Sequence, residues 1–335
     1  MIMSQDRIDQ EHAMLNRIVV GFANDGHQVI RVVPLTPNDE LAENEKAVSL
    51  AKRITTPMPV SWLLRNTRRE EVLNSIEKIE IDAVIAFGDD ACKLALDIEP
   101  YVNAPVYKEV LSIREAKRAR KSSKITKWLA ATPSIARAIA KKVGESRVAV
   151  VPLAAASSQL VQTTPSSKNK CITILDGASN PKATKQILEA VRQLQGIHVF
   201  MELTGKNHHK VWKMVDQLGM LDRVTCLRDI ATLRTLITES DLVLLPSSTM
   251  PIRTVLLEVM LASIPIIATS IDGFDMLIDD ETAIVTNESW QEAINKVLND
   301  PTIGDRLAKT GAHLVREQYA SAVQIAAFED AFSLN

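Results

Sequence analysis

The sequence predicts an α/β protein built from two doubly wound domains that face a cleft. Short apolar runs rich in β-branched residues alternate with longer segments of helical period along the whole chain. The runs of the second half are apolar without interruption, which is typical of parallel strands buried on both faces. One polar, proline-containing segment separates the two series and predicts a linker.

The length of 335 residues supports two domains, because a single core stops growing well below that size. We place the N-terminal domain at residues 1–162, the linker at 163–170 and the C-terminal domain at 171–317. Ligands of doubly wound sheets bind beyond the carboxyl ends of the strands, so the functional residues are expected there.

In the first half, the sequence predicts strands at residues 28–34, 82–88, 127–132 and 147–153. A helix is expected over residues 12–25, where apolar side chains recur at helical spacing, and Gly26 is expected to end it. In the second half, six buried strands are expected, at residues 171–177, 198–203, 223–227, 241–247, 264–269 and 282–286.

Composition excludes some functional classes. With 39 basic and 41 acidic residues, the chain has no global field that would draw it onto nucleic acid. Its three cysteines (Cys92, Cys171 and Cys226) match no disulfide framework or zinc spacing and are expected to be reduced. The N-terminal apolar run is too short for a signal peptide, and no later run reaches about 18 residues. We expect a cytoplasmic protein.

The order of motifs resembles the group 1 family of retaining, nucleotide-sugar-dependent glycosyltransferases, which have the GT-B fold of two Rossmann-like domains. "GFANDGHQVIRVVP" is similar to the helix of the family that precedes its second strand, and "LGMLDRVTCL" resembles its Leu-Gly-x-x-Asp-Arg-Val stretch. "ESDLVLLPSS", "VLLEVMLASIPIIAT" and "SAVQIAAFEDAF" follow in the order of the family. The resemblance covers nearly the whole chain and implies that residues 318–335 form a helix that packs back on the N-terminal domain.

The resemblance also implies a donor site in the C-terminal domain. Glu258 occupies the position of the second acid of the Glu-x7-Glu motif, which binds the ribose hydroxyls of the donor. The alternative is an acid that is favoured near the N-terminus of its helix by the helix dipole. The first acid, which clamps the sugar, is replaced by Met250, a weak hydrogen-bond acceptor. Pro251 and Arg253 stand where the family has glycines, and Thr254 follows among the candidate contacts of the nucleotide sugar.

The cations that hold the donor diphosphate in the family are partly retained. Lys182 matches the family's lysine, although a solvated residue at the start of a helix is an equal alternative. The family's arginine aligns with Gly177, and Arg253 or Lys185 is an alternative source of a replacement charge in a different geometry. Gly205 resembles a glycine near the nucleotide base. We expect no metal or other cofactor, since the cations stabilise the leaving diphosphate themselves.

The acceptor side of the N-terminal domain lacks the family's histidine, because Phe87 stands in its place. Asp89 or Asp90 could bind a sugar hydroxyl, but the favoured interpretation is an N-cap of the following helix. The family's glycine-containing first loop corresponds to "SQDRIDQEH", where His12 either faces the cleft or is structural.

Two further segments have less specific interpretations. His208 and His209 lack a third ligand at metal spacing and are expected at the surface start of a helix. The basic run from Arg114 to Lys127 resembles an amphipathic helix that rests on anionic lipid at the inner membrane surface in related enzymes, and a solvated helix face explains it equally well.

Two functions remain open from the sequence. The first is hexosyl transfer from a nucleoside diphosphate sugar to an unidentified acceptor with retention, carried out by Lys182 and Glu258. The second is a catalytically inactive relative that serves as a binding or chaperone subunit of a partner glycosyltransferase. The replaced glycines and charges favour the second, and the retained acid and lysine favour nucleotide binding in either case.

Overall fold

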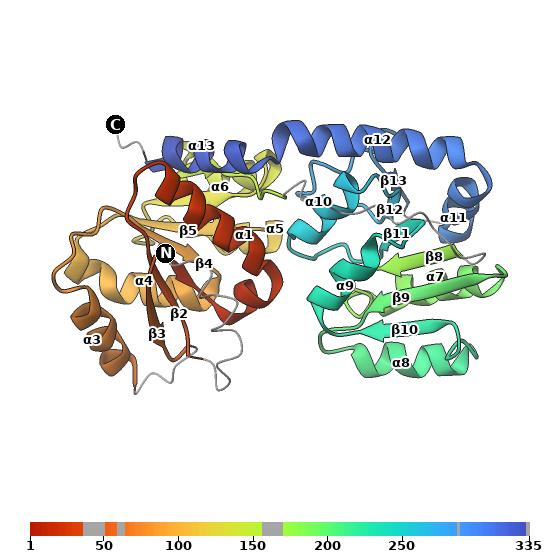
Figure 1. Ribbon diagram of the computed structural model, residues 1–335, viewed down its shortest axis with the longest axis horizontal. Coiled ribbons are helices and arrows are strands. Elements are labelled where there is room, and N and C mark those ends of the chain that lie inside the picture. The colour runs from red at the N-terminus through yellow and green to blue at the C-terminus, as the bar shows by residue number, and fades with distance from the viewer. Residues whose placement is uncertain (36–50, 59–63, 156–169, 287–288, 333–335) are drawn as a thin grey trace. The chain divides into compact units, whose positions relative to one another are not determined.

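The computed structural model describes residues 1–35, 51–58, 64–155, 170–286 and 289–332 (Figure 1). The chain divides into two compact units: unit 1 comprises Met1–Ala154 and Ser321–Asn335, and unit 2 comprises Ala155–Ala320. The expected linker at 163–170 lies outside the described residues apart from Lys170, the first residue of a strand. Each unit has its own parallel sheet, and the α/β fold with two doubly wound sheets is confirmed.

The described residues of unit 1 form a seven-stranded sheet in the order β3-β2-β1-β4-β5-β6-β7, and the neighbouring strands pair in parallel. The chain reverses the direction in which strands are added between β1 and β4, which makes this point the topological switch. The strands are β1 (Ile2–Met3), β2 (Ile30–Pro34), β3 (Lys52–Thr56), β4 (Val84–Phe87), β5 (Val106–Val110), β6 (Lys127–Ala130) and β7 (Val148–Val150).

Helices cover both faces of this sheet (Figure 1). They are α1 (Gln5–Asn24), α3 (Arg65–Ile76), α4 (Asp89–Val102), α5 (Ile113–Ala116), α6 (Pro133–Val143), the short 3₁₀ helix η2 (Glu145–Arg147) and α13 (Ser321–Phe332). The expectation of a loop at "SQDRIDQEH" is wrong, since α1 begins at Gln5. Ile8 and Leu15 lie on its buried face, so helical apolar spacing already starts in this segment. Gly26 follows α1 with φ +89°, the left-handed conformation expected of a helix-ending glycine.

The last helix, α13, belongs to unit 1 and packs on α1, as the resemblance implies. Phe328 of α13 meets Phe22 of α1 edge to face, with ring centroids 5.5 Å apart. The buried Gln324 amide lies 3.6 Å from the sulfur of Met14. A Cβ at Gly21 would come within 2.6 Å of the side chain of Ile325, so a glycine permits the close approach of the two helices.

In unit 2, the described residues form a six-stranded parallel sheet in the order β10-β9-β8-β11-β12-β13. All six strands expected in the second half of the sequence are confirmed: β8 (Lys170–Ile174), β9 (Ile197–Glu202), β10 (Val224–Leu227), β11 (Leu242–Leu245), β12 (Ile266–Ala268) and β13 (Ile284–Val285). The accompanying helices are α7 (Pro181–Arg192), α8 (His208–Gln217), α9 (Ile230–Ile237), α10 (Thr254–Leu261), α11 (Trp290–Asn299) and α12 (Pro301–Gln318). The switch point lies between β8 and β11.

Gly88 connects β4 to α4 at the switch point of unit 1, and its conformation predicts that substitution lowers stability. It has φ +95° and ψ 167°, a region open almost only to glycine, and a Cβ there would lie 1.9 Å from the hydroxyl oxygen of Ser4. Gly144 has φ +96° and ψ 152° with nothing within 4 Å of its Cβ position, and is the matched control. We expect Gly144→Ala to lower the free energy of unfolding by about 1 kcal/mol and Gly88→Ala by about 2–3 kcal/mol, measured by urea denaturation. Equal losses would show that the contact with Ser4 is unimportant.

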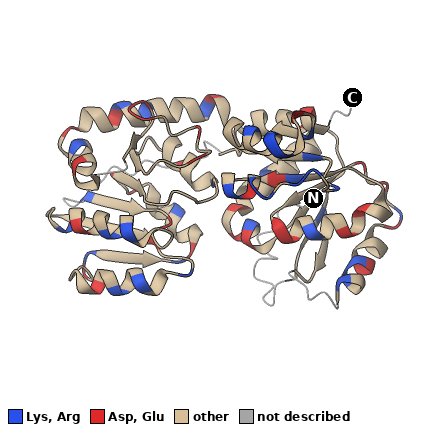
Figure 2. Ribbon diagram, turned by 180° about the vertical axis from the view of Figure 1, so that it is seen from behind, with Lys and Arg blue, Asp and Glu red and all other residues tan. Residues whose placement is uncertain are grey.

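Lysine and arginine residues are interspersed with acidic residues along the helices of both units, so neither unit carries a field of one sign (Figure 2). In the described part of the chain, we find no helix that is long and apolar enough to span a membrane.

Candidate functional site

The candidate site of unit 2 lies at the carboxyl ends of β8 and β11, the two strands that flank the switch point. Residues 175–180 connect β8 to α7, and residues 246–253 connect β11 to α10. The side-chain amide of Asn180 joins the two connections: it donates to the carbonyl of Pro246 at 3.0 Å, and its oxygen accepts from the amide of Ala183 at 3.2 Å. Asn180 is thereby the N-cap of α7.

Lys182 is the second residue of α7 and is exposed at this edge of the sheet. The described residues contain no hydrogen-bond or ion-pair partner for its ammonium group. The buried face of α7, which includes Ile187 and Leu188, fixes the helix against the core. The structure therefore presents an uncompensated cation at the N-terminus of a twelve-residue helix, where the helix dipole also favours an anion.

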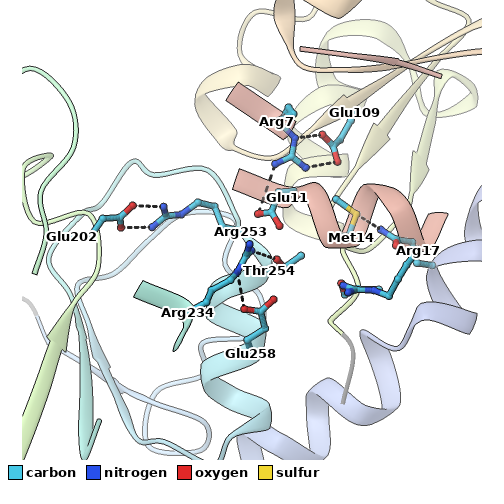
Figure 3. Close-up of polar contacts among 12 residues, drawn as sticks. Arg7, Glu11, Met14, Arg17, Glu109, Glu202, Arg234, Arg253, Thr254 and Glu258 are labelled. Carbon is cyan, nitrogen blue, oxygen red and sulfur yellow. Dashed lines mark hydrogen bonds and ion pairs between the residues drawn. The ribbon is translucent and has the colours of Figure 1, made fainter. Parts of the chain in front are cut away.

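Glu258 and Thr254 are joined by an arginine that the sequence did not single out (Figure 3). Arg234, on α9, donates from Nε to Oε2 of Glu258 at 2.9 Å and from Nη2 to the hydroxyl of Thr254 at 2.7 Å. The Glu258 side chain is 20% exposed. Glu258 is the fifth residue of α10, beyond its first turn, so a guanidinium partner fixes this carboxylate and the proposed helix-dipole role is wrong.

Arg253 forms a second, deeper ion pair with Glu202, the last residue of β9 (Figure 3). The guanidinium donates from Nη1 to Oε1 at 2.6 Å and from Nη2 to Oε2 at 2.7 Å, and both side chains are 7% exposed. The backbone amide of Asp176 donates to the same carboxylate at 2.8 Å. The sequence makes Arg253 a candidate replacement cation for the diphosphate, but in the structure its two terminal nitrogens donate to an internal carboxylate.

The pKa values of two carboxyl groups in this cluster are shifted in opposite directions. Burial disfavours the charged form of Glu202, but the charge and hydrogen bonds of Arg253 and the amide of Asp176 outweigh it and hold the pKa of Glu202 below its usual value. Burial raises the pKa of Asp176, although the nearby Arg253 charge and hydrogen bonds from Ser179 and Ser247 act against the rise. One guanidinium thus faces two carboxyl groups, of which Glu202 is the firmly ionised one.

Three further donor-side candidates lie in the connections of this sheet: Gly177 between β8 and α7, Met250 between β11 and α10, and Gly205 between β9 and α8. Met250 is buried, with 4% of its surface exposed, in the segment before α10. A Cβ at Gly177 would lie 3.0 Å from the side chain of Met201, so the position that carries arginine in the family has little room for a side chain here. Gly205 is exposed with φ +86°, and its carbonyl lies 2.8 Å from Nδ1 of His208.

In unit 1, Asp89 and Asp90 are not N-caps, because Gly88 occupies the N-cap of α4 and both acids lie in the first turn. Asp89 binds Lys108 at 2.6 Å and Arg118 at 2.8 Å. Burial acts against its charged form, but these cations lower the pKa of Asp89. Asp90 pairs with Lys93. The two acids line a cavity of about 280 Å³ together with Gln5, Asp6 and Met58.

His12 lies on α1, half-buried, with its Nε2 3.3 Å from the side-chain nitrogen of Asn16. The same helix carries a buried charge cluster that the sequence analysis does not predict (Figure 3). In this cluster, Arg7 donates two hydrogen bonds of 2.9 Å to Glu109 of β5 and lies 3.8 Å from Glu11. The backbone of α1 departs from helical angles at Glu11.

The basic run from Arg114 to Lys127 is not an amphipathic helix. After α5, which ends at Ala116, the chain continues in turns to β6. Three apolar residues of the run, Ala116, Ala119 and Ile125, are buried and belong to the core of unit 1. His208 and His209 begin α8, as expected. No group of three or more potential metal ligands occurs among the residues that the structure describes.

Comparison with known proteins identifies the relatives of the chain. The sequence model of the family "Glycosyl transferases group 1" matches residues 170–300, within unit 2. The alpha-D-kanosaminyltransferase of Streptomyces kanamyceticus is 28% identical over 115 residues, and the match spans 32% of this chain and 30% of that protein. This match therefore covers less than a third of the relative's length.

Solved structures have a similar fold. Alr3699/HepE of Anabaena, solved in complex with UDP-glucose, has a TM-score of 0.76 at 15% identity over 99% of both chains. The sucrose-phosphate synthase of Thermosynechococcus elongatus has a TM-score of 0.76 at 14% identity over 96% of this chain and 92% of that one. At such identities the likeness establishes the GT-B fold. The chain therefore has the GT-B fold, and residues 170–300 are similar to the group 1 glycosyl transferases.

Proposed function

We propose that the chain is a retaining glycosyltransferase that moves a hexosyl group from a nucleoside diphosphate sugar to a hydroxyl-bearing acceptor. The observation that carries this proposal is Lys182, an exposed cation without a partner among the described residues, at the N-terminus of α7 and at the switch point of unit 2. An uncompensated cation at a helix N-terminus is suited to a phosphate group.

The ribose is assigned to Glu258, on helix α10, which follows strand β11 on the other side of the switch point. A carboxylate accepts hydrogen bonds from two vicinal hydroxyls, and Arg234 restricts its orientation before the ligand arrives. In the reaction, the bond from the anomeric carbon to the diphosphate oxygen breaks, and the acceptor oxygen bonds to the same face of the sugar. The acceptor proton passes to the departing phosphate. Lys182 compensates the charge that develops on that phosphate.

A second candidate is a catalytically inactive subunit that binds nucleotide sugars and assists a partner glycosyltransferase. It is favoured by Met250 in place of the sugar-binding acid and by the engagement of Arg253 with Glu202. A donor-hydrolysis assay separates the two candidates, because release of hexose from the donor requires the leaving-group chemistry and binding alone does not.

Nucleotide binding tests the shared part of both candidates. We expect isothermal titration to detect UDP binding, with GDP and ADP as the alternatives; UDP comes first because the Anabaena protein was solved with UDP-glucose. Glu258→Ala should raise Kd about tenfold, equivalent to about 1.4 kcal/mol, and Arg234→Gln should raise it similarly through the loss of orientation. The double variant should lose no more than Glu258→Ala alone, since both act through one carboxylate.

An additive loss in the double variant would show that Arg234 acts independently of Glu258. Absence of binding by UDP, GDP and ADP at millimolar concentration would remove the nucleotide site and with it the proposed function.

A further inference from the structure

The Glu202 carboxylate is held like a bound anion. Three donors converge on it: Nη1 and Nη2 of Arg253, at 2.6 and 2.7 Å, and the backbone amide of Asp176, at 2.8 Å. A planar guanidinium with a backbone amide is the donor set that proteins use for phosphate. The donors come from the two connections that flank the switch point, where ligands of such sheets bind.

Gly177 and Arg253, two positions at which the chain departs from the family that it resembles, both contact Glu202. Residue 177, where the family has an arginine, is a glycine whose amide donates to the carbonyl of Glu202 at 3.0 Å. Arg253, where the family has a glycine, brings a guanidinium to the side chain of the same residue. Residues 175–180 thus lack an arginine side chain, and Arg253, from residues 246–253, brings a guanidinium to the same neighbourhood. The carboxylate of Glu202, on β9, neutralises that guanidinium.

We propose that Glu202 is a specificity-determining residue of the donor site: as an internal anion, it neutralises the positive charge that Arg253 would otherwise offer, with the Asp176 amide, to a ligand phosphate. The inference rests on the proposed function, because it concerns the same site. In the wild-type protein the diphosphate is left to Lys182 and the start of α7, and the guanidinium takes no part. Removing the negative charge of Glu202 leaves the guanidinium of Arg253 without this counter-ion and increases the attraction of the site for an anion.

The other charges around the pair define how the test must be built. Asp176 faces the same guanidinium, and Arg234 also acts on the Glu202 carboxylate. The carboxylate of Asp176 could form an ion pair with Arg253 when Glu202 is neutralised. The main variant therefore combines Glu202→Gln with Asp176→Asn. Asparagine suits the left-handed φ of +52° at position 176 and preserves the local backbone.

The probe is inorganic pyrophosphate, which has no ribose and does not depend on Glu258. Its Kd is measured by isothermal titration, and its effect on Tm by calorimetry, for the full chain and its variants. We expect Glu202→Gln/Asp176→Asn to bind pyrophosphate at least about tenfold more tightly than the wild type, since two repelling carboxylates have been removed. Adding Arg253→Met should abolish the gain.

The chain offers a matched control in unit 1. Arg7 and Glu109 form another buried bidentate pair, with two bonds of 2.9 Å, and Glu109→Gln removes a carboxylate of the same kind. Its pyrophosphate affinity should stay at the wild-type value, because Glu11 remains beside Arg7. If the double variant gives no cooperative unfolding transition, Glu202→Asp keeps the charge but retracts it by one methylene, and a smaller gain in affinity is expected.

Unchanged or weaker pyrophosphate binding by a folded Glu202→Gln/Asp176→Asn or Glu202→Asp variant overturns the inference, as does a gain that survives Arg253→Met. The UDP titrations of the wild type and Glu258→Ala give the separate result on the proposed function. A gain for pyrophosphate without any UDP binding would support the anion hole and reject the nucleotide site. UDP binding without a gain in pyrophosphate affinity would support the nucleotide site and reject the inference about Glu202.

Discussion

Replacing Lys182 with alanine is expected to lower kcat for donor turnover about 10²–10³-fold, the usual cost of removing one well-placed electrostatic donor. The leaving diphosphate gains negative charge as the sugar departs. Gly177 offers it no side-chain cation, and Arg253 is bound to Glu202. In the proposed function, Lys182 is the cation among the described residues that faces the leaving group, so its loss should act mainly on kcat and much less on KM.

Lys185, one turn later on α7, provides the matched control. It is exposed like Lys182 but lies 3.5 Å from Glu189 on its own helix. Lys185→Ala removes the same charge from the same helix and should leave kcat close to the wild-type value. Equal losses in the two variants would mean that the net charge of the helix matters rather than the position of Lys182. No loss in Lys182→Ala would reject its assignment to the leaving group.

The parallel sheets could be predicted from the sequence where strands are buried on both faces. Strands β11 and β12 are buried at every position, and the edge strands β10 and β13, which are only partly buried, were expected because their sequences are still mostly apolar. Three strands of unit 1 were missed for different reasons: β1 has only two residues, while β3 and β5 contain exposed or half-buried polar residues at several positions. Such strands are recognisable only from their neighbours in the sheet, because their own sequences lack a long apolar run.

The candidate site could be predicted only as far as single positions. Glu258 and Lys182 are predicted from motifs at fixed spacing, and the structure places both at the same edge of one sheet. Their partners could not be found in this way, since Arg234 lies 24 residues from Glu258, and Arg253 lies 51 residues from Glu202. One signal was available: Glu202 is a charged residue directly after the apolar run of β9. A buried charge needs a partner, and Arg253 is that partner.

The Arg253–Glu202 pair also controls the stability of unit 2. Arg253→Met is expected to lower its free energy of unfolding by about 3–5 kcal/mol at neutral pH, because a carboxylate that is 7% exposed loses its counter-ion while the packing volume is largely kept. Calorimetry of the full chain measures the loss as a lower Tm for the transition of unit 2. The double variant Arg253→Met/Glu202→Gln should recover most of it, since neither member of the pair then carries a buried charge.

The pH dependence distinguishes this electrostatic loss from a loss of packing. In the wild type the lowered pKa of Glu202 stabilises the folded state above the unfolded value of about 4.3, and the contribution disappears as the pH falls through the lowered pKa. In Arg253→Met, burial without the guanidinium raises the pKa of Glu202, so the variant loses stability as the pH rises through that raised value. The difference in Tm between the two proteins should therefore be largest near neutral pH and shrink below about pH 4. A difference that is independent of pH would assign the loss to packing.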